Sequence, residues 1–248
     1  MKRLSRKEEK KLFNLGYLDL LEGNPCPGKW QLPQMISKSK TCPDYIALYS
    51  QPGDYSHTPN AAVCFAQYDN VIDGLNGIFN AIKYERMACL EKFRRRFKDV
   101  TFIIIPDYSQ YGGGPNWVNA GNLGKGRIVG LWFQKVMRKI VIPLITFPDL
   151  EWLDEVLIGL MKCDIVAFHT KCYVRNLAER KILIKAVIKT VDTLPLLKTI
   201  VVYDVCGKDD AVDSIFLYAR EKNIRVVVPD NMLKCRNCNR SKKRMIDQ

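Results

Sequence analysis

One pattern recurs from residue 61 onward and constrains the fold more than any other feature of the sequence. A short apolar run ends at a polar residue, and a stretch with helical periodicity follows it. The runs contain little polar alternation, which is typical of strands covered on both faces, and the helices between them indicate parallel pairing. The predicted strands are Ala61–Phe65, Thr101–Pro106, Ile140–Phe147, Asp164–Phe168, Thr199–Tyr203 and Arg225–Val228.

The predicted fold class is therefore α/β, with a mostly parallel sheet of six or seven strands and flanking helices. Tyr45–Tyr49 is the candidate seventh strand. The strand count favours an open doubly wound sheet, and an incomplete barrel is the alternative. The predicted helices are Val71–Phe97, Asn122–Val136, Leu150–Met161, Asn176–Thr193 and Asp209–Asn223.

The 248 residues divide into three predicted segments. Residues 1–60 form an irregular basic N-terminal extension with strong turn signals such as Pro52-Gly53. Residues 61–231 form the α/β domain, and residues 232–248 form a basic tail that contains cysteines. Because 47% of the residues are hydrophobic, the composition excludes global disorder and suffices for a core without disulfides.

The net charge of +13 is concentrated in three blocks. Residues 1–12 hold six basic and two acidic side chains, residues 83–98 hold seven and two, and residues 234–248 hold six and one, so the rest of the chain is close to neutral. Local blocks of positive charge are typical of proteins that bind the phosphate backbone of nucleic acids. The candidate nucleic-acid-binding residues are Arg94, Arg95, Arg96, Lys98, Lys242, Lys243 and Arg244.

The sequence predicts a cytoplasmic protein without a membrane partner. No apolar run approaches the length that crosses a bilayer, and the first 13 residues are too charged for a secretory signal. The nine cysteines are odd in number and scattered in spacing, which argues against a secreted disulfide framework.

Polar residues follow the ends of the predicted strands. In parallel α/β folds these ends meet at one edge of the sheet, where active sites gather. Asp107, Tyr108 and His169 are the candidate catalytic residues, and Asp107 would act as a general base or bind a divalent metal. The alternative for an aspartate after a strand is an N-cap of the following helix. The polar residues at strand ends are Asp69, Asp107, Asp149, His169, Thr170, Asp204 and Asp230.

A glycine-rich segment, residues 107–127, suggests a ligand-binding loop. Gly112–Gly114 allow a sharp turn, and Tyr111 would form the wall of a pocket. Asn122 at a predicted helix N-terminus, with Lys125 and Arg127, would bind an anion such as a phosphate group. The segment matches neither a P-loop nor a dinucleotide fingerprint, and a flexible surface loop is the alternative.

Asp107-Tyr108-Ser109-x-Tyr111 resembles the D-[FY]-S-x-Y signature of a family of domains of unknown function that is common in phages and mobile genetic elements. The resemblance covers residues 60–230 and adds Gln134 to the candidate ligand-binding residues. It implies an α/β domain and a mobile-element setting but no reaction. The sequence departs from the family pattern twice, at His169-Thr170, where Ser-Thr and a glycine are usual, and at Tyr203-Asp204, where Tyr-Gly is usual. The stretches that carry the resemblance further are Pro115, Asn122, Arg127, Gly130-x-Trp132-Phe133-Gln134, Ile142-Pro143 and Asp149.

Cys235-x-x-Cys238 has the spacing of half a zinc site, which needs two further ligands. A frayed tail and a redox-active thiol pair are the alternatives.

Three functions follow from these observations. The preferred one is nucleic-acid binding through the basic blocks. The second is an enzyme that acts over Asp107 on a phosphate-bearing substrate, with metal or acid–base catalysis. The third is a regulatory or counter-defence protein that sequesters a nucleotide. The oligomeric state is left open.

Overall fold

The computed structural model describes residues 5–13, 15–56, 58, 60–174, 176–205 and 209–238. Every paired strand lies parallel to its neighbours, and the predicted α/β class is confirmed. The strands are β1 (Tyr45–Leu48), β2 (Ala61–Cys64), β3 (Phe102–Ile104), β4 (Ile140–Ile142), β5 (Ile165–His169), β6 (Thr199–Tyr203) and β7 (Arg225–Val227). The helices are α1 (Arg6–Phe13), the 3₁₀ helix η1 (Gly16–Leu21), α2 (Pro52–Ser56), α3 (Asp69–Ile72), α4 (Ile78–Lys83), α5 (Met87–Arg96), α6 (Asn116–Lys135), α7 (Leu153–Ile158), α8 (Leu177–Thr193), α9 (Asp209–Ile215) and α10 (Leu217–Glu221).

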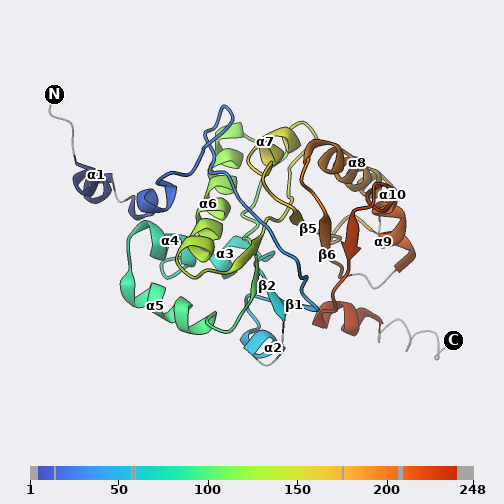
Figure 1. The fold of residues 1–248 in the computed structure, drawn as a ribbon, viewed down its shortest axis with the longest axis horizontal. Helices are drawn as coiled ribbons and strands as arrows, with labels where there is room; N and C mark the ends of the chain where they lie inside the picture. The colour runs from blue at the N-terminus through green and yellow to red at the C-terminus, as the bar shows by residue number, and fades with distance from the viewer. Residues whose placement is uncertain are drawn as a thin grey trace.

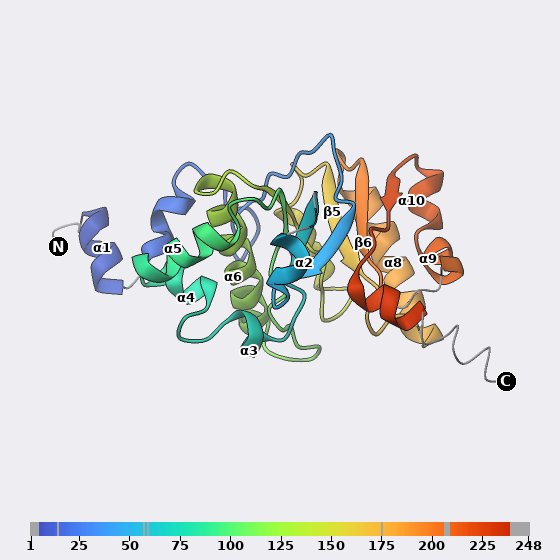
Figure 2. The same ribbon diagram turned by 90° about the horizontal axis from the view of Figure 1, so that it is seen from below.

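The strands form two sheets in chain order, β1-β2-β3-β4 and β5-β6-β7. Single parallel bridges join the sheets at both seams, Leu144 with Ala167 and Tyr45 with Asp230. This order is that of the incomplete barrel, because a doubly wound sheet requires the strand order to reverse at a switch point. Neither seam carries a continuous ladder, so the barrel is not closed. Figures 1 and 2 show α6 on one side of the strands and α8 and α10 on the other.

The core lies between the strands and these helices. Strands β2, β3 and β6 are buried at every position, as their unbroken apolar runs predict. Phe65, Phe97 and Phe133 form an aromatic cluster between β2, α5 and α6, with ring centroids 5.3–5.9 Å apart. The eight cysteines among the described residues are free thiols, so apolar packing rather than cross-linking holds this part of the chain together.

Part of the predicted N-terminal extension belongs to this packed body. Strand β1 pairs with β2, across the boundary predicted at residue 61. The preceding stretch runs across the molecule to β1 (Figure 1) and passes the amino ends of β4 and β5. There the Ser37 hydroxyl donates to the Val141 carbonyl (2.5 Å), and the Asp164 amide donates to the Ser37 carbonyl (2.8 Å).

Three helix predictions require correction. The single helix expected at 209–223 is two helices, α9 and α10, which Phe216 separates. The single helix expected at 71–97 is three helices, α3, α4 and α5, and the chain between them turns through Gly74 (φ 137°) and Glu85 (φ 49°). Helix α6 begins at Asn116 rather than Asn122, so the later glycines lie inside it. At Gly126 a methyl group would sit 2.8 Å from the Pro106 carbonyl oxygen, so this glycine lets α6 approach the end of β3.

None of the helices in the described ranges is both long and apolar enough to cross a bilayer.

Candidate active site

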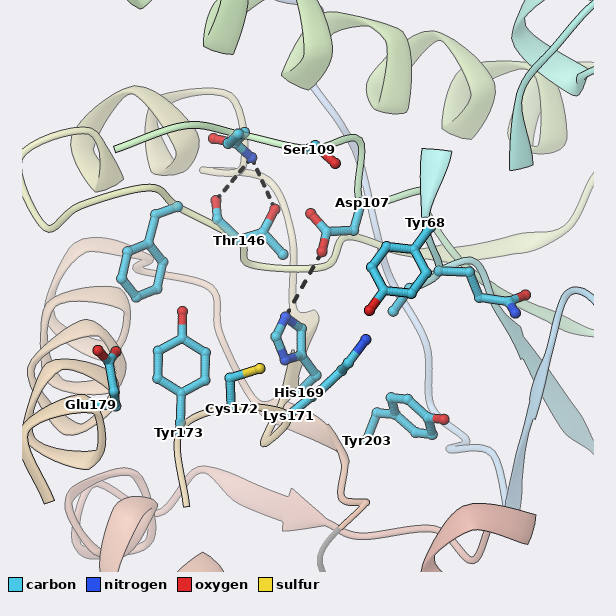
Figure 3. Close-up of a pocket in the computed structure, with 14 residues that line it drawn as sticks. Tyr68, Asp107, Ser109, Thr146, His169, Lys171, Cys172, Tyr173, Glu179 and Tyr203 are labelled. Atoms are coloured by element: carbon cyan, nitrogen blue, oxygen red, sulfur yellow. Dashed lines mark hydrogen bonds and ion pairs between the residues drawn. The ribbon is translucent and has the colours of Figure 1, made fainter. Parts of the chain in front are cut away.

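Residues that follow β2 to β6 line one cavity of about 360 Å³ (Figure 3). Of the seven polar residues predicted at strand ends, Asp107 and His169 are the two that line it. It lies at the carboxyl ends of the parallel strands, where crossover connections bring successive loops together. The loop after β2 contributes Tyr68, the loop after β3 Asp107, and the loop after β4 Phe147. His169 comes from the end of β5 and Tyr203 from the end of β6.

Asp107 and His169 face each other inside the cavity (Figure 3). The Asp107 Oδ2 and His169 Nε2 atoms are 3.9 Å apart, and their side chains are 27% and 17% exposed. Burial raises the pKa of Asp107, and this effect is opposed by His169 and by the Thr146 hydroxyl. Burial lowers the pKa of His169, and Asp107 opposes that effect. Both shifts favour the uncharged form of each group, and each group opposes the shift of the other.

Hydrogen bonds hold the loop after β3 in place around Asp107. The amide and hydroxyl of Ser109 both donate to Asp69 Oδ1, at 3.0 and 3.1 Å. The Gln110 side-chain amide donates to the Thr146 hydroxyl at 3.0 Å. Asn122 on α6 donates to the Ser109 carbonyl at 2.6 Å, so it positions this loop from outside the cavity.

The aromatic and cationic residues of the cavity were not predicted as site residues. Tyr173 lies beside His169, with ring centroids 5.8 Å apart, and beside Phe147, at 6.4 Å. The Lys171 ammonium lies 4.8 Å from the centre of the Tyr68 ring. These side chains follow the strand ends by two to five residues. Their closeness to a strand end is the only signal in the sequence that could have indicated them.

Tyr108, Tyr111 and Lys125 lie outside the cavity. The Tyr108 side chain packs edge-on against Phe79 with a centroid distance of 6.4 Å. Burial raises its pKa, and its hydroxyl has no hydrogen-bond partner among the described residues. Lys125 lies 5.5 Å from the same ring. Tyr111 is 55% exposed, and its backbone exchanges hydrogen bonds with the Asn119 side chain.

Arg127 and Gln134 are also separate from Asp107. Arg127 is 1% exposed and donates to the carbonyls of Pro33 (3.3 Å) and Val156 (2.7 Å). Gln134 donates to the Ile36 carbonyl. The predicted anion site therefore does not assemble, because Asn122, Lys125 and Arg127 lie within α6 rather than at its start.

A buried hydrogen bond joins the ends of β5 and β6 beside the cavity. The Thr170 hydroxyl donates to Asp204 Oδ1 at 2.6 Å, and the Asn231 side chain donates to the Asp204 carbonyl at 2.7 Å. Asp204, a candidate from its position after a strand, is 0% exposed and joins strands instead of lining the cavity.

The predicted nucleic-acid-binding arginines have partners within the chain. Arg96 donates to the Tyr55 hydroxyl and the Tyr49 carbonyl, and its guanidinium stacks 4.3 Å from the centre of the Tyr49 ring. Arg94 and Arg95 each lie 3.5 Å from a carboxylate oxygen of Glu91. Lys98 lies 3.8 Å from Asp99, and Lys242, Lys243 and Arg244 lie outside the described residues.

Neither predicted metal position gathers a complete ligand set in the part of the chain that the structure describes. Within it, no three His, Cys, Asp or Glu side chains are grouped so that they could hold a metal ion. Cys235 and Cys238 lie on a short helix at residues 232–238.

The comparisons with known proteins identify a family but no activity. A family model described as a domain of unknown function (DUF4417) matches residues 24–219, a range that includes β1 to β6 and every residue that lines the cavity. No curated protein and no solved structure matches the chain. The resemblance to a family of unknown function is thus confirmed, and the phage setting stays a prediction. Because the match covers most of the chain, the protein belongs to the DUF4417 family.

Proposed function

We propose that the protein is an enzyme that transfers a proton to or from a small molecule bound in the cavity, with Asp107 and His169 as the acid–base pair. The observation that carries this proposal is the 3.9 Å approach of these two side chains in a cavity at the carboxyl ends of five strands. A buried carboxyl whose pKa is raised, beside a buried imidazole whose pKa is lowered, can donate or accept a proton during a reaction. Catalytic hydrogen bonds are often long in the absence of substrate and shorten when substrate binds, so a distance of 3.9 Å is compatible with this role.

The volume of the cavity favours a small-molecule substrate over the end of a polymer chain. Its volume falls within the range of about 300–1,000 Å³ that is usual for small-molecule sites. The phosphate-binding role predicted for Lys125 and Arg127 has no support, since both lie outside the cavity. Lys171 lines it and would hold any anionic group of the substrate.

The proposal is tested by substrate depletion. Wild-type protein, Asp107→Asn and His169→Asn are incubated with a cell-free small-molecule extract, and untargeted mass spectrometry records which compounds are consumed or formed. Arg95→Gln is the matched control, because the Arg95 side chain is 74% exposed and lies outside the cavity. We expect wild type and the control to consume the same compounds and both cavity variants to lose this activity while keeping the wild-type melting temperature. Turnover that persists in both cavity variants refutes the proposal, and so does an extract that wild type leaves unchanged.

Nucleic-acid binding is the second candidate, supported by the contact between two basic blocks. The Lys10 ammonium donates to Glu85 at 2.7 Å, which joins α1 to the start of the 83–98 block. Lys7, Lys11 and Lys83 line the cleft between them, which has a volume of about 520 Å³. Such a cluster suits the phosphate backbone of a single strand.

Fluorescence anisotropy of a labelled single-stranded oligonucleotide tests this second function. Replacement of Lys7, Lys11 and Lys83 by Gln should weaken binding and make the salt dependence of the affinity shallower by about 0.7 per lost phosphate contact. Lys181→Gln with Lys185→Gln is the control, since both lysines are exposed on α8. Equal effects of the two variants, or no binding by wild type at 50 mM salt, contradict this function.

A further inference from the structure

Tyr68 is an exposed aromatic residue at the mouth of the cavity. The residue is 71% exposed, although a tyrosine in a folded protein usually buries most of its surface. The Lys171 ammonium, 4.8 Å from the ring centre, also lines the cavity. The Tyr68 ring therefore has the Lys171 ammonium near it, and most of its surface is open to solvent.

The chain holds Tyr68 at this position. Its neighbour Asp69 accepts hydrogen bonds from the amide and hydroxyl of Ser109, at 3.0 and 3.1 Å. These bonds tie the loop after β2 to the loop after β3, which carries Asp107. Tyr68 therefore stands at a fixed place relative to the acid–base pair, as a binding surface requires.

A second aromatic wall lies across the cavity. Figure 3 shows Tyr173 on the opposite side of the Asp107–His169 pair from Tyr68. Phe147 supports Tyr173 with a ring centroid distance of 6.4 Å and an interplanar angle of 31°. Aromatic surfaces on two sides of a polar pair suit a flat ring whose edge carries groups that exchange protons.

We infer that the ligand of this cavity carries a planar heteroaromatic ring of the nucleobase class, which stacks on Tyr68 and presents its edge to Asp107 and His169. The inference rests on the proposed function, because it names the class of substrate for the same cavity. A nucleobase combines a face that stacks on tyrosine with ring nitrogens that accept or donate protons. The cavity volume of about 360 Å³ suits a ligand of nucleoside size.

Binding of nucleosides to the Asp107→Asn variant tests this inference, since binding is then measured without turnover. Adenosine, guanosine, cytidine and uridine are titrated separately, saturation-transfer NMR reports which ligand protons contact the protein, and ribose is the control without a base. Tyr68→Ala is compared with Tyr111→Ala, because Tyr111 is 55% exposed and lies outside the cavity. Tyr68→Phe keeps the ring and removes only the hydroxyl.

We expect at least one nucleoside to bind through its base protons and ribose not to bind. Tyr68→Ala should weaken the affinity by about 5- to 150-fold, the range for loss of one base-stacking contact, while Tyr68→Phe and Tyr111→Ala should leave it unchanged. Absence of nucleoside binding at millimolar concentration overturns the inference, as does equal weakening by the two alanine variants. If turnover depends on Asp107 and His169 but nucleosides do not bind, the substrate class fails and the proposed function stands. If nucleosides bind but turnover survives in both cavity variants, the proposed function fails and the substrate class stands.

Discussion

Replacement of Arg127 by Met measures what this buried cation does for stability. The variant leaves the carbonyls of Pro33 and Val156 without their donor, at a cost of about 1–3 kcal/mol each. The void beyond the shorter side chain adds about 1 kcal/mol. Burial lowers the pKa of Arg127 to about 10, and removal of the charge relieves a penalty of about 3 kcal/mol. These contributions sum to a loss of about 0–4 kcal/mol, so the expected net loss of unfolding free energy is about 2 kcal/mol.

Urea unfolding followed by tryptophan fluorescence measures this loss, since the chain has four tryptophans. A loss of about 2 kcal/mol corresponds to a melting temperature lower by about 4–8 °C for a chain of this length. Arg95→Met is the control and should unfold like wild type, because the Arg95 side chain is 74% exposed. An unchanged or higher stability of Arg127→Met refutes the reasoning, because the two carbonyl contacts would then contribute nothing net.

Three further predictions concern the cavity, the strand ends and the basic run. The NMR titration of His169 should give a pKa below 6.5 that falls further in Asp107→Asn, because the carboxylate favours the imidazolium; an unchanged pKa would contradict the pairing. Since folding lowers this pKa, protonation of His169 opposes folding, so its contribution to the unfolding free energy should rise as the pH increases toward 6.5, and His169→Gln should flatten that rise in urea titrations. Asp204→Asn should cost about 1–3 kcal/mol in urea unfolding, and a double-mutant cycle with Thr170→Val should show that the two losses are not additive. Arg96→Met should lower the melting temperature without changing the affinity for a labelled oligonucleotide, because Arg96 binds Tyr55 and Tyr49. A weaker affinity at an unchanged melting temperature would indicate instead that Arg96 contacts nucleic acid.

The strands were predictable because a strand that is buried on both faces appears in the sequence as an unbroken run of apolar residues. Each predicted apolar run contains a strand, and the runs at 61–65 and 199–203 match β2 and β6 within one residue. The strand order was not predictable, because it depends on the two seams. Tyr45 pairs with Asp230 across 185 residues, and neither residue carries a local signal for that contact. Long-range pairing of this kind is set by packing and not by periodicity.

The shared cavity of Asp107 and His169 was predictable, because parallel strands bring their carboxyl ends together. The prediction for Lys125 and Arg127 is wrong because the glycines near them, which are typical of a loop, lie in a helix. In the structure, Gly126 and Gly130 lie inside α6, where a methyl group would meet the Pro106 carbonyl oxygen at 2.8 Å and the Met35 side chain at 2.7 Å. Glycine has low helix propensity, and tertiary packing outweighs that preference here. A single sequence cannot distinguish a glycine that turns the chain from one that allows close packing.

The turn after β5 has a left-handed backbone conformation that the sequence does not indicate, because no glycine occupies that position. Cys172 has φ of 75°, in the left-handed region that favours glycine and costs other residues about 1–2 kcal/mol. The family resemblance expects a glycine near Thr170 that this chain lacks. The turn nevertheless forms, with the Tyr173 amide donating to the Thr170 carbonyl at 3.1 Å. The turn places Tyr173 beside His169, so the local strain at Cys172 and the aromatic wall of the cavity have the same geometric origin.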